Sequence, residues 1–375
     1  MKIALVVPGG VDRSGEYRVI PVFLSLIARL ARVHEVHVFA LRQEAQPGRW
    51  ELVGATVHNI GDGWQRLRAI AAIRTEHRRA PFDLVHAIFS GHCSLVAIAA
   101  AMWLRLPSVV HIAGGELVAL HDIGYGGRRT VWARSREAVV LRLADAVTAA
   151  SAPIVDALHA LGIKARRVPL GVDLRAWPPL APRRRAGTAA HLVHVASLNR
   201  VKDQATLLRA LAAVVESGID VRMDIVGVDT LQGKIQQCAH DLGLDANVRF
   251  LGFKTQQELR SVVEAADLLV MSSRHEAGPL VLLEAAVAGV PTVGTAVGHI
   301  AEWSPTAALA VPVGDWAALA TAMRRVLKDE DLRLRLAWQA QRRAMLEDAD
   351  HTAAMFEALY LHLVCTRRKR RQAVA

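Results

Sequence analysis

The chain has 375 residues, of which 52% are apolar and 22% charged, and this balance excludes a disordered protein and fits two domains of ordinary size. The net charge of +11 is concentrated in residues 1–180, with 22 Lys and Arg against 14 Asp and Glu, and in the last eleven residues, which add five basic side chains; this asymmetry favours an anionic surface as a partner. Three isolated cysteines, Cys93, Cys238 and Cys365, exclude a disulfide framework and are typical of free thiols in a reducing compartment.

Short apolar runs alternate with helical patterns in the first half of the chain. The runs are predicted strands at 2–8, 36–41, 83–89, 107–113 and 146–150. Helices are predicted between them at 19–32, 64–79, 95–104 and 130–143. Such alternation predicts a parallel sheet with helices on both faces.

A loop rich in Pro, Arg and Ala, residues 174–190, interrupts this pattern, which then starts again. Strands are predicted at 191–197, 221–227, 247–253, 267–273, 291–296 and 308–312. Helices are predicted at 203–217, 231–242, 255–265, 280–288, 316–327, 331–347 and 350–364. The sequence therefore predicts two Rossmann-like, doubly wound α/β domains that face each other across a cleft, with ligands bound outside the carboxyl ends of the strands.

No segment is expected to cross a bilayer. The longest uncharged apolar run, Leu95 to Leu104, has ten residues, about half of the roughly 20 that a crossing needs. The opening residues MKIALVV are predicted to form the first strand rather than a signal peptide, because the apolar stretch is short and lacks a small-residue cleavage site. We therefore expect a cytoplasmic protein.

The most informative stretch is residues 272–302. Glu276 lies in a Gly/Pro loop after a predicted strand, and Glu284 lies about one turn into the following helix. The free N–H groups and the positive end of that helix form an anion site suited to a diphosphate, through Gly278, Leu280 and Val281. The two glutamates are expected to accept hydrogen bonds from hydroxyl groups of a sugar and a ribose.

These residues resemble the donor signature of the GT-B glycosyltransferases, specifically glycosyltransferase family 4 of the bacterial cell-envelope and exopolysaccharide type. The resemblance covers nearly the whole chain and is strongest over residues 192–302. It implies a nucleotide-diphosphate-sugar as co-substrate, no metal ion or other cofactor, and retention of the anomeric configuration. It places Glu276 near the transferred sugar and Glu284 on the ribose hydroxyls. Gly298 and Glu302 match the family's GGxxE segment, with His299 in place of the second glycine.

A second match is HVASLNRVKDQATLLRAL, residues 194–211. In the family this strand-to-helix loop supplies an arginine and a lysine to the diphosphate. Lys202 occupies the lysine position, whereas Ser197 stands at the arginine position and Arg200 is the alternative source of that charge. The resemblance thus makes Lys202 a catalytic residue beside Glu276.

The turn VRFLGFKT resembles the family's base-contacting turn, in which backbone groups near Phe253 and Lys254 would read the base. Backbone recognition leaves the identity of the base open.

The acceptor side is expected in the first half of the chain, where the Gly-rich loop with Gly9 and Gly10 resembles the family's opening. A second loop, 111–129, resembles the acceptor loop: Gly115 and Glu116 match, as does the adjacent Gly114, but Ala113 stands where a histidine is usual. His111, two residues earlier, either reaches the site or is a core histidine. Tyr125 and the arginines at 128 and 129 are further candidates for acceptor contacts.

The resemblance also assigns the domains. Residues 1–173 would form the acceptor-binding domain, completed by a C-terminal crossover helix at 350–375, and residues 191–349 the donor domain, with 174–190 as the linker.

A basic amphipathic helix is predicted at 64–79, and the tail carries RRKRR at 367–371. Both favour peripheral attachment to an anionic membrane, namely the inner face of the plasma membrane; a solvated helix and a disordered tail are the alternative. The sequence lacks a basic motif interleaved with aromatic residues, so we expect no nucleic-acid partner.

These features together predict a retaining glycosyltransferase that transfers a sugar to a hydroxyl of a glycan or lipid-linked acceptor. Two alternatives remain open: a nucleotide-sugar 2-epimerase of the same two-domain build, and a non-catalytic sugar-nucleotide-binding subunit. A dehydrogenase is disfavoured because no GxGxxG with an acid about 20 residues later follows the first strand.

Overall fold

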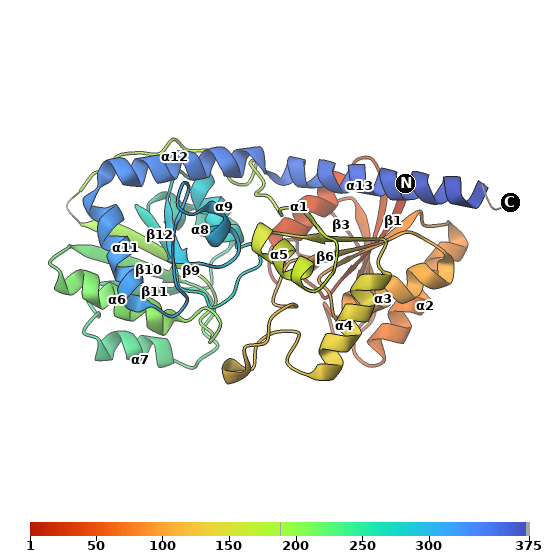
Figure 1. Ribbon diagram of the computed structural model, residues 1–375, viewed down its shortest axis with the longest axis horizontal. Helices are drawn as coiled ribbons and strands as arrows, with labels where there is room; N and C mark the ends of the chain where they lie inside the picture. Colours follow the sequence, from red (N-terminus) through yellow and green to blue (C-terminus); the bar gives the residue numbers. More distant parts are fainter. Residues whose placement is uncertain (188, 373–375) are drawn as a thin grey trace. The chain divides into compact units, whose positions relative to one another are not determined.

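The computed structural model describes residues 1–187 and 189–372, with side chains described as far as Lys369. The chain folds into two α/β units (Figure 1). Unit 1 contains Met1–Leu170 together with the C-terminal segment that begins at Ala349, and unit 2 contains Gly171–Asp348.

Unit 1 is built on an eight-stranded sheet in the order β3-β4-β2-β1-β5-β6-β7-β8. The pairs are parallel except for the antiparallel β3–β4 pair. The strands are β1 (Lys2–Val7), β2 (Glu35–Ala40), β3 (Gly48–Leu52), β4 (Ala55–Asn59), β5 (Leu84–Ile88), β6 (Ser108–Ile112), β7 (Ala146–Ala149) and β8 (Arg166–Arg167). Every residue of β1, β5 and β6 is buried, as expected for central strands covered on both faces.

The helices of unit 1 follow the strands in alternation. They are α1 (Pro21–Leu30), α2 (Gln65–Arg79), α3 (His92–Leu104), the 3₁₀ helix η1 (His121–Ile123), α4 (Val131–Leu143), α5 (Ala152–Ala160) and α13 (Ala349–Gln372).

The C-terminal helix α13 is fastened to unit 1 by polar contacts and by ring packing. The Nε of Arg29 in α1 donates to Oδ1 of Asp350 at 2.7 Å. The hydroxyl of Tyr360 lies 2.6 Å from Nδ1 of His86 on β5, and both side chains are buried. These long-range contacts explain why α13 belongs to unit 1 although it follows unit 2 in the chain.

Unit 2 is built on a six-stranded, all-parallel sheet in the order β11-β10-β9-β12-β13-β14. The strands are β9 (Ala190–Val195), β10 (Val221–Val226), β11 (Val248–Gly252), β12 (Leu268–Met271), β13 (Thr292–Thr295) and β14 (Leu309–Val311). The helices are α6 (Gln204–Glu216), α7 (Lys234–Asp241), α8 (Gln256–Glu264), α9 (Leu280–Val287), α10 (Gly298–Trp303), α11 (Trp316–Lys328) and α12 (Glu330–Leu346).

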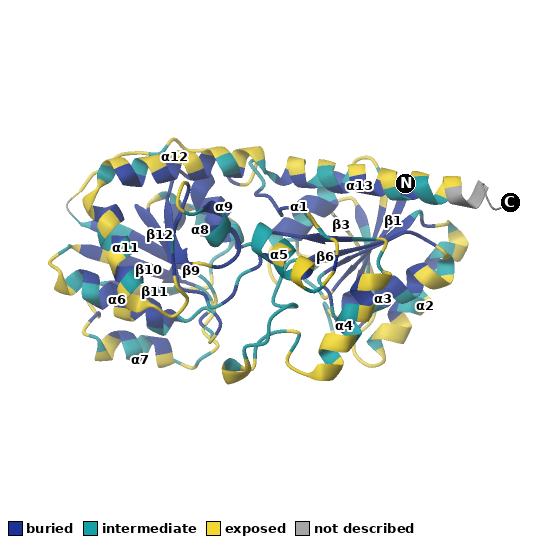
Figure 2. Ribbon diagram, viewed as in Figure 1, coloured by how far each residue is buried: buried dark blue, intermediate teal, exposed yellow. Residues whose placement is uncertain are grey.

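Two apolar clusters form the core of unit 2, one on each face of the sheet. Residues of α6, α7 and α11 pack on one face, and residues of α8, α9 and α10 pack on the other. Figure 2 shows the strands buried between helices whose outward faces are exposed. The predicted fold class, two α/β domains with parallel sheets, is thereby confirmed in each unit.

Several short elements lie outside the prediction. The strands β3 and β4 alternate buried with more exposed residues, so they lack the continuous apolar run by which the other strands were recognised. The helices α5 and α10 have nine and six residues, too few to display a clear helical period.

Within the predicted linker, Trp177 and the backbone of Leu180 pack against unit 2. Trp177 is only 2% exposed, within the core cluster that contains α9. The N–H of Leu180 donates to the carbonyl oxygen of Val287 at 3.0 Å, and Nε2 of Gln341 donates to the carbonyl oxygen of Leu180 at 2.6 Å. The proline-rich composition of this segment predicts irregular backbone, as observed. The buried side chain of Trp177 fixes where this backbone packs on unit 2.

Replacing Trp177 by alanine should therefore lower the free energy of unfolding by about 3–5 kcal/mol, because a fully buried indole is removed. Urea unfolding followed by far-UV circular dichroism measures the change. Leu180→Ala, in the same segment but 39% exposed, is the control and should cost about 1 kcal/mol or less. Equal, small losses in both variants would contradict the packing of this segment.

Candidate functional site

The predicted donor residues of unit 2 lie on loops that leave adjacent strands at their carboxyl ends. Lys202 follows β9 and Glu276 follows β12, and these two strands are neighbours in the sheet. The two loops are joined directly: the N–H of Arg274 donates to the carbonyl oxygen of Val201 at 2.7 Å, and Oγ of Ser272 donates to the carbonyl oxygen of Lys202 at 2.8 Å. Parallel topology thus brings together residues that are 74 positions apart.

The centre of the site is an ion pair between Lys202 and Glu276. The Nζ of Lys202 donates to Oε1 of Glu276, and Oγ of Ser273 donates to the same oxygen at 2.6 Å. The side chains of Lys202 and Glu276 are 24% and 11% exposed. Within the described chain Oε2 of Glu276 receives no hydrogen bond, so this oxygen is available to a ligand hydroxyl.

Asn199 shapes the loop that carries Lys202. Its Oδ1 accepts the backbone N–H groups of Val201 and Lys202 at 3.2 and 3.1 Å. An asparagine that bonds to the backbone two and three residues ahead holds a tight turn, and this turn places Lys202 just before α6.

A buried histidine, His194, supports the loop that carries Lys202. His194 on β9 has Nδ1 2.8 Å from the carbonyl oxygen of Val270 and Nε2 3.3 Å from Nε2 of Gln204. Burial lowers the pKa of His194 to about 4, so the ring is neutral: Nδ1–H donates to the carbonyl and Nε2 accepts from the amide. Sequence reasoning missed His194 and Gln204, because only the fold shows that they meet.

The N-terminus of α9 borders Glu276. Pro279 is the residue before the helix, and neither a side-chain cap nor an acidic residue occupies the first turn. Gly278 and Leu280 are half-buried and Val281 is buried. The first-turn N–H groups have no partner within the helix, which leaves the positive helix end available to an anion.

Gly298 allows α10 to approach this loop closely. Its φ is +50°, and a Cβ at this position would lie 3.0 Å from the carbonyl oxygen of Glu276. A larger residue would be strained in this backbone conformation and would push against the loop that holds Glu276. The following matched residue, Glu302, lies near Arg343, with Oε1 3.5 Å from Nη2.

Glu284 is buried inside α9, with 7% of its surface exposed. Burial raises the pKa of Glu284 to about 7, although a hydrogen bond from the Gln256 side chain opposes the rise. A carboxyl group with this pKa exchanges its proton near neutral pH, so a ligand that donates hydrogen bonds to the carboxylate would favour ionisation. The sequence contained no signal for Gln256.

The remaining predicted donor residues lie on exposed loops of the same sheet edge. Ser197 and Arg200 are exposed on the loop after β9. Phe253 is 53% exposed and directly follows β11. Their ligand contacts stay predictions.

In unit 1 the predicted acceptor residues lie on the loops after β1 and β6. Gly10 has a φ of +81°, and its N–H donates to Oε1 of Gln43 at 2.7 Å. Gly9 precedes it and packs near the backbone of Arg42. The two glycines thus let this loop pack against the loop that follows β2.

The loop after β6 is held by its own glutamate. Oε2 of Glu116 accepts the N–H of Gly114 at 2.7 Å, and Oε1 accepts the N–H groups of Ser90 and Ala113 at 3.2 and 3.4 Å. Burial raises the pKa of Glu116, while these N–H groups lower it. The carboxylate therefore organises the loop, and a contact with an acceptor stays a prediction.

Tyr125 lies against Gly115. A Cβ at Gly115 would be 2.5 Å from the Tyr125 hydroxyl, so only glycine permits this approach.

His111 is a core histidine, which corrects its placement on the acceptor side. It is fully buried, its Nδ1 lies 2.9 Å from Oγ1 of Thr148 on β7, and its ring meets that of Phe356 edge-on at 5.4 Å. Burial lowers its pKa to about 3, so the ring is uncharged. The side chain points to the sheet face on which α13 packs rather than to the loops.

A buried carboxyl group that sequence reasoning missed lies beside this loop. Oε1 of Glu137 on α4 accepts from Oγ of Ser90 at 2.5 Å, and Oε2 is buried without a hydrogen-bond partner among the described residues. Burial raises the pKa of Glu137, although the Ser90 hydroxyl opposes the rise.

Three side chains of unit 1, His37, His58 and Glu76, are close enough to share a metal ion. They already have protein partners: Nδ1 of His37 lies 2.9 Å from Nε2 of His58, and Nζ of Lys2 donates to Oε1 of Glu76 at 3.1 Å. The ammonium group of Lys2 already pairs with Glu76, the only carboxylate of the three side chains, and its positive charge would repel a metal ion. The cluster therefore fits a structural network better than a metal centre.

No helix within residues 1–187 and 189–372 combines the length and the apolar character needed to span a membrane. In the basic tail, Nη1 of Arg367 lies 3.4 Å from Asp145 and Nη2 of Arg368 lies 3.1 Å from Asp83. These two arginines are thus paired within unit 1. The side chains of residues 370 and 371 lie outside the described part.

Known protein families match both halves of the chain. Residues 22–176 match the family described as Glycosyltransferase Family 4, and residues 182–343 match that described as Glycosyl transferases group 1. The D-inositol 3-phosphate glycosyltransferase of Corynebacterium urealyticum is 33% identical over 178 residues, which are 45% of this chain and 42% of that protein. The glycogen synthase of Mycobacterium tuberculosis is 29% identical over 297 residues, 77% of this chain and 70% of that protein. The first alignment thus spans less than half of the relative.

Solved structures share the fold. A sucrose-phosphate synthase from Thermosynechococcus elongatus has a TM-score of 0.79 at 18% identity and covers 98% of this chain and 100% of its own. The Anabaena protein Alr3699/HepE, in complex with UDP-glucose, has a TM-score of 0.73 at 20% identity and covers 97% and 100%.

The raised pKa of Glu284 predicts a pH-dependent stability. The folded protein holds this proton up to about pH 7 and the unfolded chain releases it near its ordinary value of 4.5, so the free energy of unfolding falls as the pH rises between these values. Glu284→Gln should therefore gain up to about 3 kcal/mol relative to the wild type between pH 5 and pH 8. Urea unfolding at both pH values measures this, and the exposed Glu216→Gln is the control. Parallel pH profiles of the wild type and Glu284→Gln would contradict the assignment.

Proposed function

Because the chain belongs to the glycosyltransferases of the GT-B fold, with family 4 and group 1 domains, we propose that it transfers a sugar from a nucleotide-diphosphate-sugar to a hydroxyl group of a glycan or lipid-linked acceptor. We propose further that the transfer retains the anomeric configuration and needs no metal ion. The observation that carries this proposal is the Lys202–Glu276 pair beside the uncapped N-terminus of α9.

The positive groups of the site suit a diphosphate. Lys202 is held in place by a turn and an ion pair, Arg200 is exposed two residues earlier, and the first turn of α9 offers backbone N–H groups. Such fixed donors stabilise the charge that develops on the leaving diphosphate. They supply the role that a divalent cation plays in metal-dependent enzymes, which supports a metal-independent reaction.

The carboxylates suit the hydroxyl groups of the donor. Glu276 uses Oε1 for Ser273 and Lys202, so Oε2 can accept a hydroxyl of the transferred sugar. Glu284 is buried one turn into α9 and would accept the ribose hydroxyls, which would favour its ionised form.

The proposed step exchanges two bonds at the anomeric carbon. The bond from this carbon to the diphosphate oxygen breaks, and a bond to the acceptor oxygen forms on the same face. The acceptor hydroxyl loses its proton to the departing diphosphate, so charge and atoms balance. Glu276 is already engaged by Lys202 and Ser273, which supports a binding role for it rather than that of a covalent nucleophile.

Unit 1 would bind the acceptor through its loops after β1 and β6. Glu116 would keep the second loop in shape, and the half-buried Tyr125 would offer its partly accessible side chain to the acceptor. Matched relatives bear the names of enzymes with different acceptors, D-inositol 3-phosphate and glycogen, so the family leaves the acceptor open. The basic character of residues 1–180 favours an acceptor or an acceptor-bearing surface with negative charge.

We propose that α2 and its neighbours attach the protein to an anionic membrane. Trp64 and Leu67 are 81% and 61% exposed at the start of α2, among exposed arginines at 66, 68, 78 and 79. On α3, Trp103 is 61% exposed, and the guanidinium carbon of Arg74 lies 3.6 Å from the centroid of its ring. Exposed indoles among arginines are typical of surfaces that enter the headgroup region of a bilayer.

Glu276→Gln should lower the transfer rate at least about 100-fold with the fold intact, because the amide cannot pair with Lys202 and accept the sugar hydroxyl as a carboxylate does. The donor is first selected by thermal shift with a panel of nucleotide sugars. Transfer to cell-envelope lipids and oligosaccharides is then measured with EDTA present, and NMR of the product reports the anomeric configuration.

Glu216→Gln, an exposed substitution on α6, is the matched control and should retain full activity. Near-normal turnover in Glu276→Gln would refute the assignment. Consumption of the donor in the absence of any acceptor would favour the 2-epimerase. Binding of the donor without turnover would favour a non-catalytic subunit.

Replacing both Trp64 and Leu67 by serine should reduce severalfold the fraction of protein that floats with vesicles containing phosphatidylglycerol. The reason is that two exposed apolar side chains can no longer enter the headgroup region. The control is Trp338→Ser, which removes an exposed tryptophan from α12 and should float like the wild type. Failure of the wild-type protein to float with these vesicles would contradict membrane attachment.

A further inference from the structure

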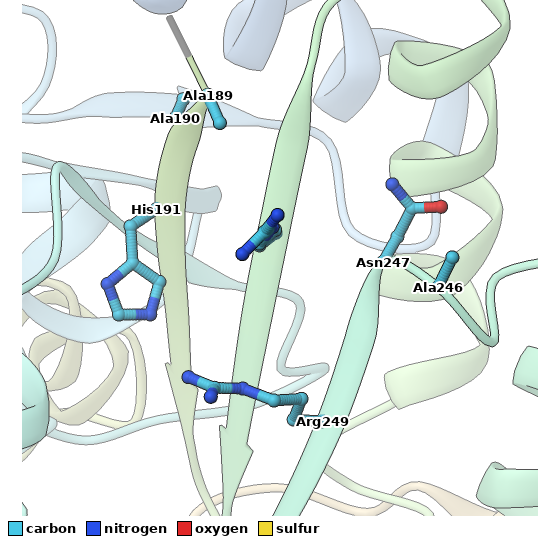
Figure 3. Close-up of a pocket in the computed structure, with 7 residues that line it drawn as sticks. Ala189, Ala190, His191, Ala246, Asn247 and Arg249 are labelled. Carbon is cyan, nitrogen blue, oxygen red and sulfur yellow. The ribbon is translucent and has the colours of Figure 1, made fainter. Parts of the chain in front are cut away.

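A second pocket lies at the amino ends of the strands of unit 2. Seven residues line a cavity of about 360 Å³ (Figure 3): Ala189, Ala190, His191, Arg222, Ala246, Asn247 and Arg249. They lie at or near the starts of β9, β10 and β11, whereas Lys202 and Glu276 follow the carboxyl ends of β9 and β12. Because a strand rises about 3.3 Å per residue, the six residues of β9 separate the two sites by roughly 20 Å.

The pocket lies on the face of β10 and β11 that is turned away from α6, α7 and α11. Met223, Ile225 and Val248 point to the face covered by α6, α7 and α11. The alternate residues of these two strands point to the other face, where the cluster formed by α8 and α9 includes β9 and β12 but no described residue of β10 or β11. Toward the amino ends of the two strands this row is polar and consists of Arg222, Asp224 and Arg249.

Asp224 organises this row. Its Oδ1 and Oδ2 accept from Nε and Nη2 of Arg249, each at 2.8 Å, and Oδ2 lies 2.8 Å from Nε2 of His191. Burial opposes ionisation of Asp224, but these hydrogen bonds lower its pKa. The other ring nitrogen of His191 lies 3.2 Å from the carbonyl oxygen of Ala265, so both nitrogens of this ring face protein oxygens.

The positive charge of the pocket exceeds the negative charge. Arg222, which stands beside His191 in the strand register, is exposed and has no hydrogen bond or ion pair to any described residue. The side chain of Arg249 is 69% exposed although it pairs with Asp224. Figure 3 shows this side chain extending from β11 toward the strand that carries His191. Of the two guanidinium groups that line the pocket, Arg249 is paired with Asp224, and Arg222 has no counter-ion among the described residues.

We propose that this pocket binds a small phosphate-bearing anion through the guanidinium groups of Arg222 and Arg249, at a site separate from the donor site. Planar guanidinium groups match the oxygens of phosphate, and Asp224 holds one of the two in a fixed orientation. The volume of about 360 Å³ exceeds that of an inorganic phosphate and suits an organic phosphate monoester of sugar-phosphate size.

Isothermal titration with inorganic phosphate and with glucose 6-phosphate tests the proposal, with the ionic strength held constant by sodium chloride. The wild-type protein should bind, and Arg222→Gln should weaken this binding at least tenfold. Arg209→Gln, an exposed arginine on α6, is the matched control and should bind like the wild type. Tighter binding of glucose 6-phosphate identifies an organic ester as the ligand, and equal binding identifies phosphate itself.

Binding of phosphate at the donor site would survive Arg222→Gln, so the comparison of the two variants isolates the second pocket. Equal affinity in the wild type and Arg222→Gln, or the absence of any binding beyond that of chloride, would overturn the proposal. Arg222 is exposed, and thermal unfolding of each variant verifies that the fold is retained.

Discussion

The ion pair between Lys202 and Glu276 joins the loops that follow two neighbouring parallel strands, and the candidate site of unit 2 is built around it. Neither charge is deeply buried, and each is supported by its own loop: a turn at Asn199 places the lysine, and the Ser273 hydroxyl fixes one oxygen of the glutamate. A pair held in this way is preorganised, because ligand binding exchanges partners without first ordering the side chains.

Burial shifts the pKa of the buried histidines and of two buried carboxyl groups in opposite directions. His86, His111 and His194 are fully buried, and each has a hydrogen-bond partner within the sheet or on a packed helix; burial lowers the pKa of each. Glu137 and Glu284 are different, because burial raises the pKa of both carboxyl groups and no cation among the described residues forms an ion pair with them. The three histidines are thus neutral groups of the core, whereas burial favours the protonated form of the two carboxyl groups.

Unit 2 has a candidate site at each end of its strands, and the two sites arise for different reasons. At the carboxyl ends, loops and helix N-termini converge, which is the usual ligand site of a parallel sheet. At the amino ends of β9, β10 and β11, the pocket lies beside Arg222, Asp224 and Arg249, on a face where the described apolar cluster of α8 and α9 includes no residue of β10 or β11. The alternation of side chains along β10 and β11 thus gathers two arginines on one face, in a half of the chain with little net charge.

The sequence by itself determined the two α/β units, most of their long helices, and Glu276, Glu284 and Lys202 as the candidate site. Apolar runs and helical periods are local properties of the chain, and the site motifs lie within short stretches around single strand ends. Short elements such as β3 and α10 lacked such a signal.

Only the tertiary structure decided which distant residues meet. It brought Glu276 to Lys202, paired Glu284 with Gln256, moved His111 from the predicted acceptor side into the core, and packed Trp177 of the expected linker into unit 2. Strand order and helix packing set these contacts, and neither can be derived from the local pattern, because the partners lie between 28 and 74 positions apart or in another layer of the fold.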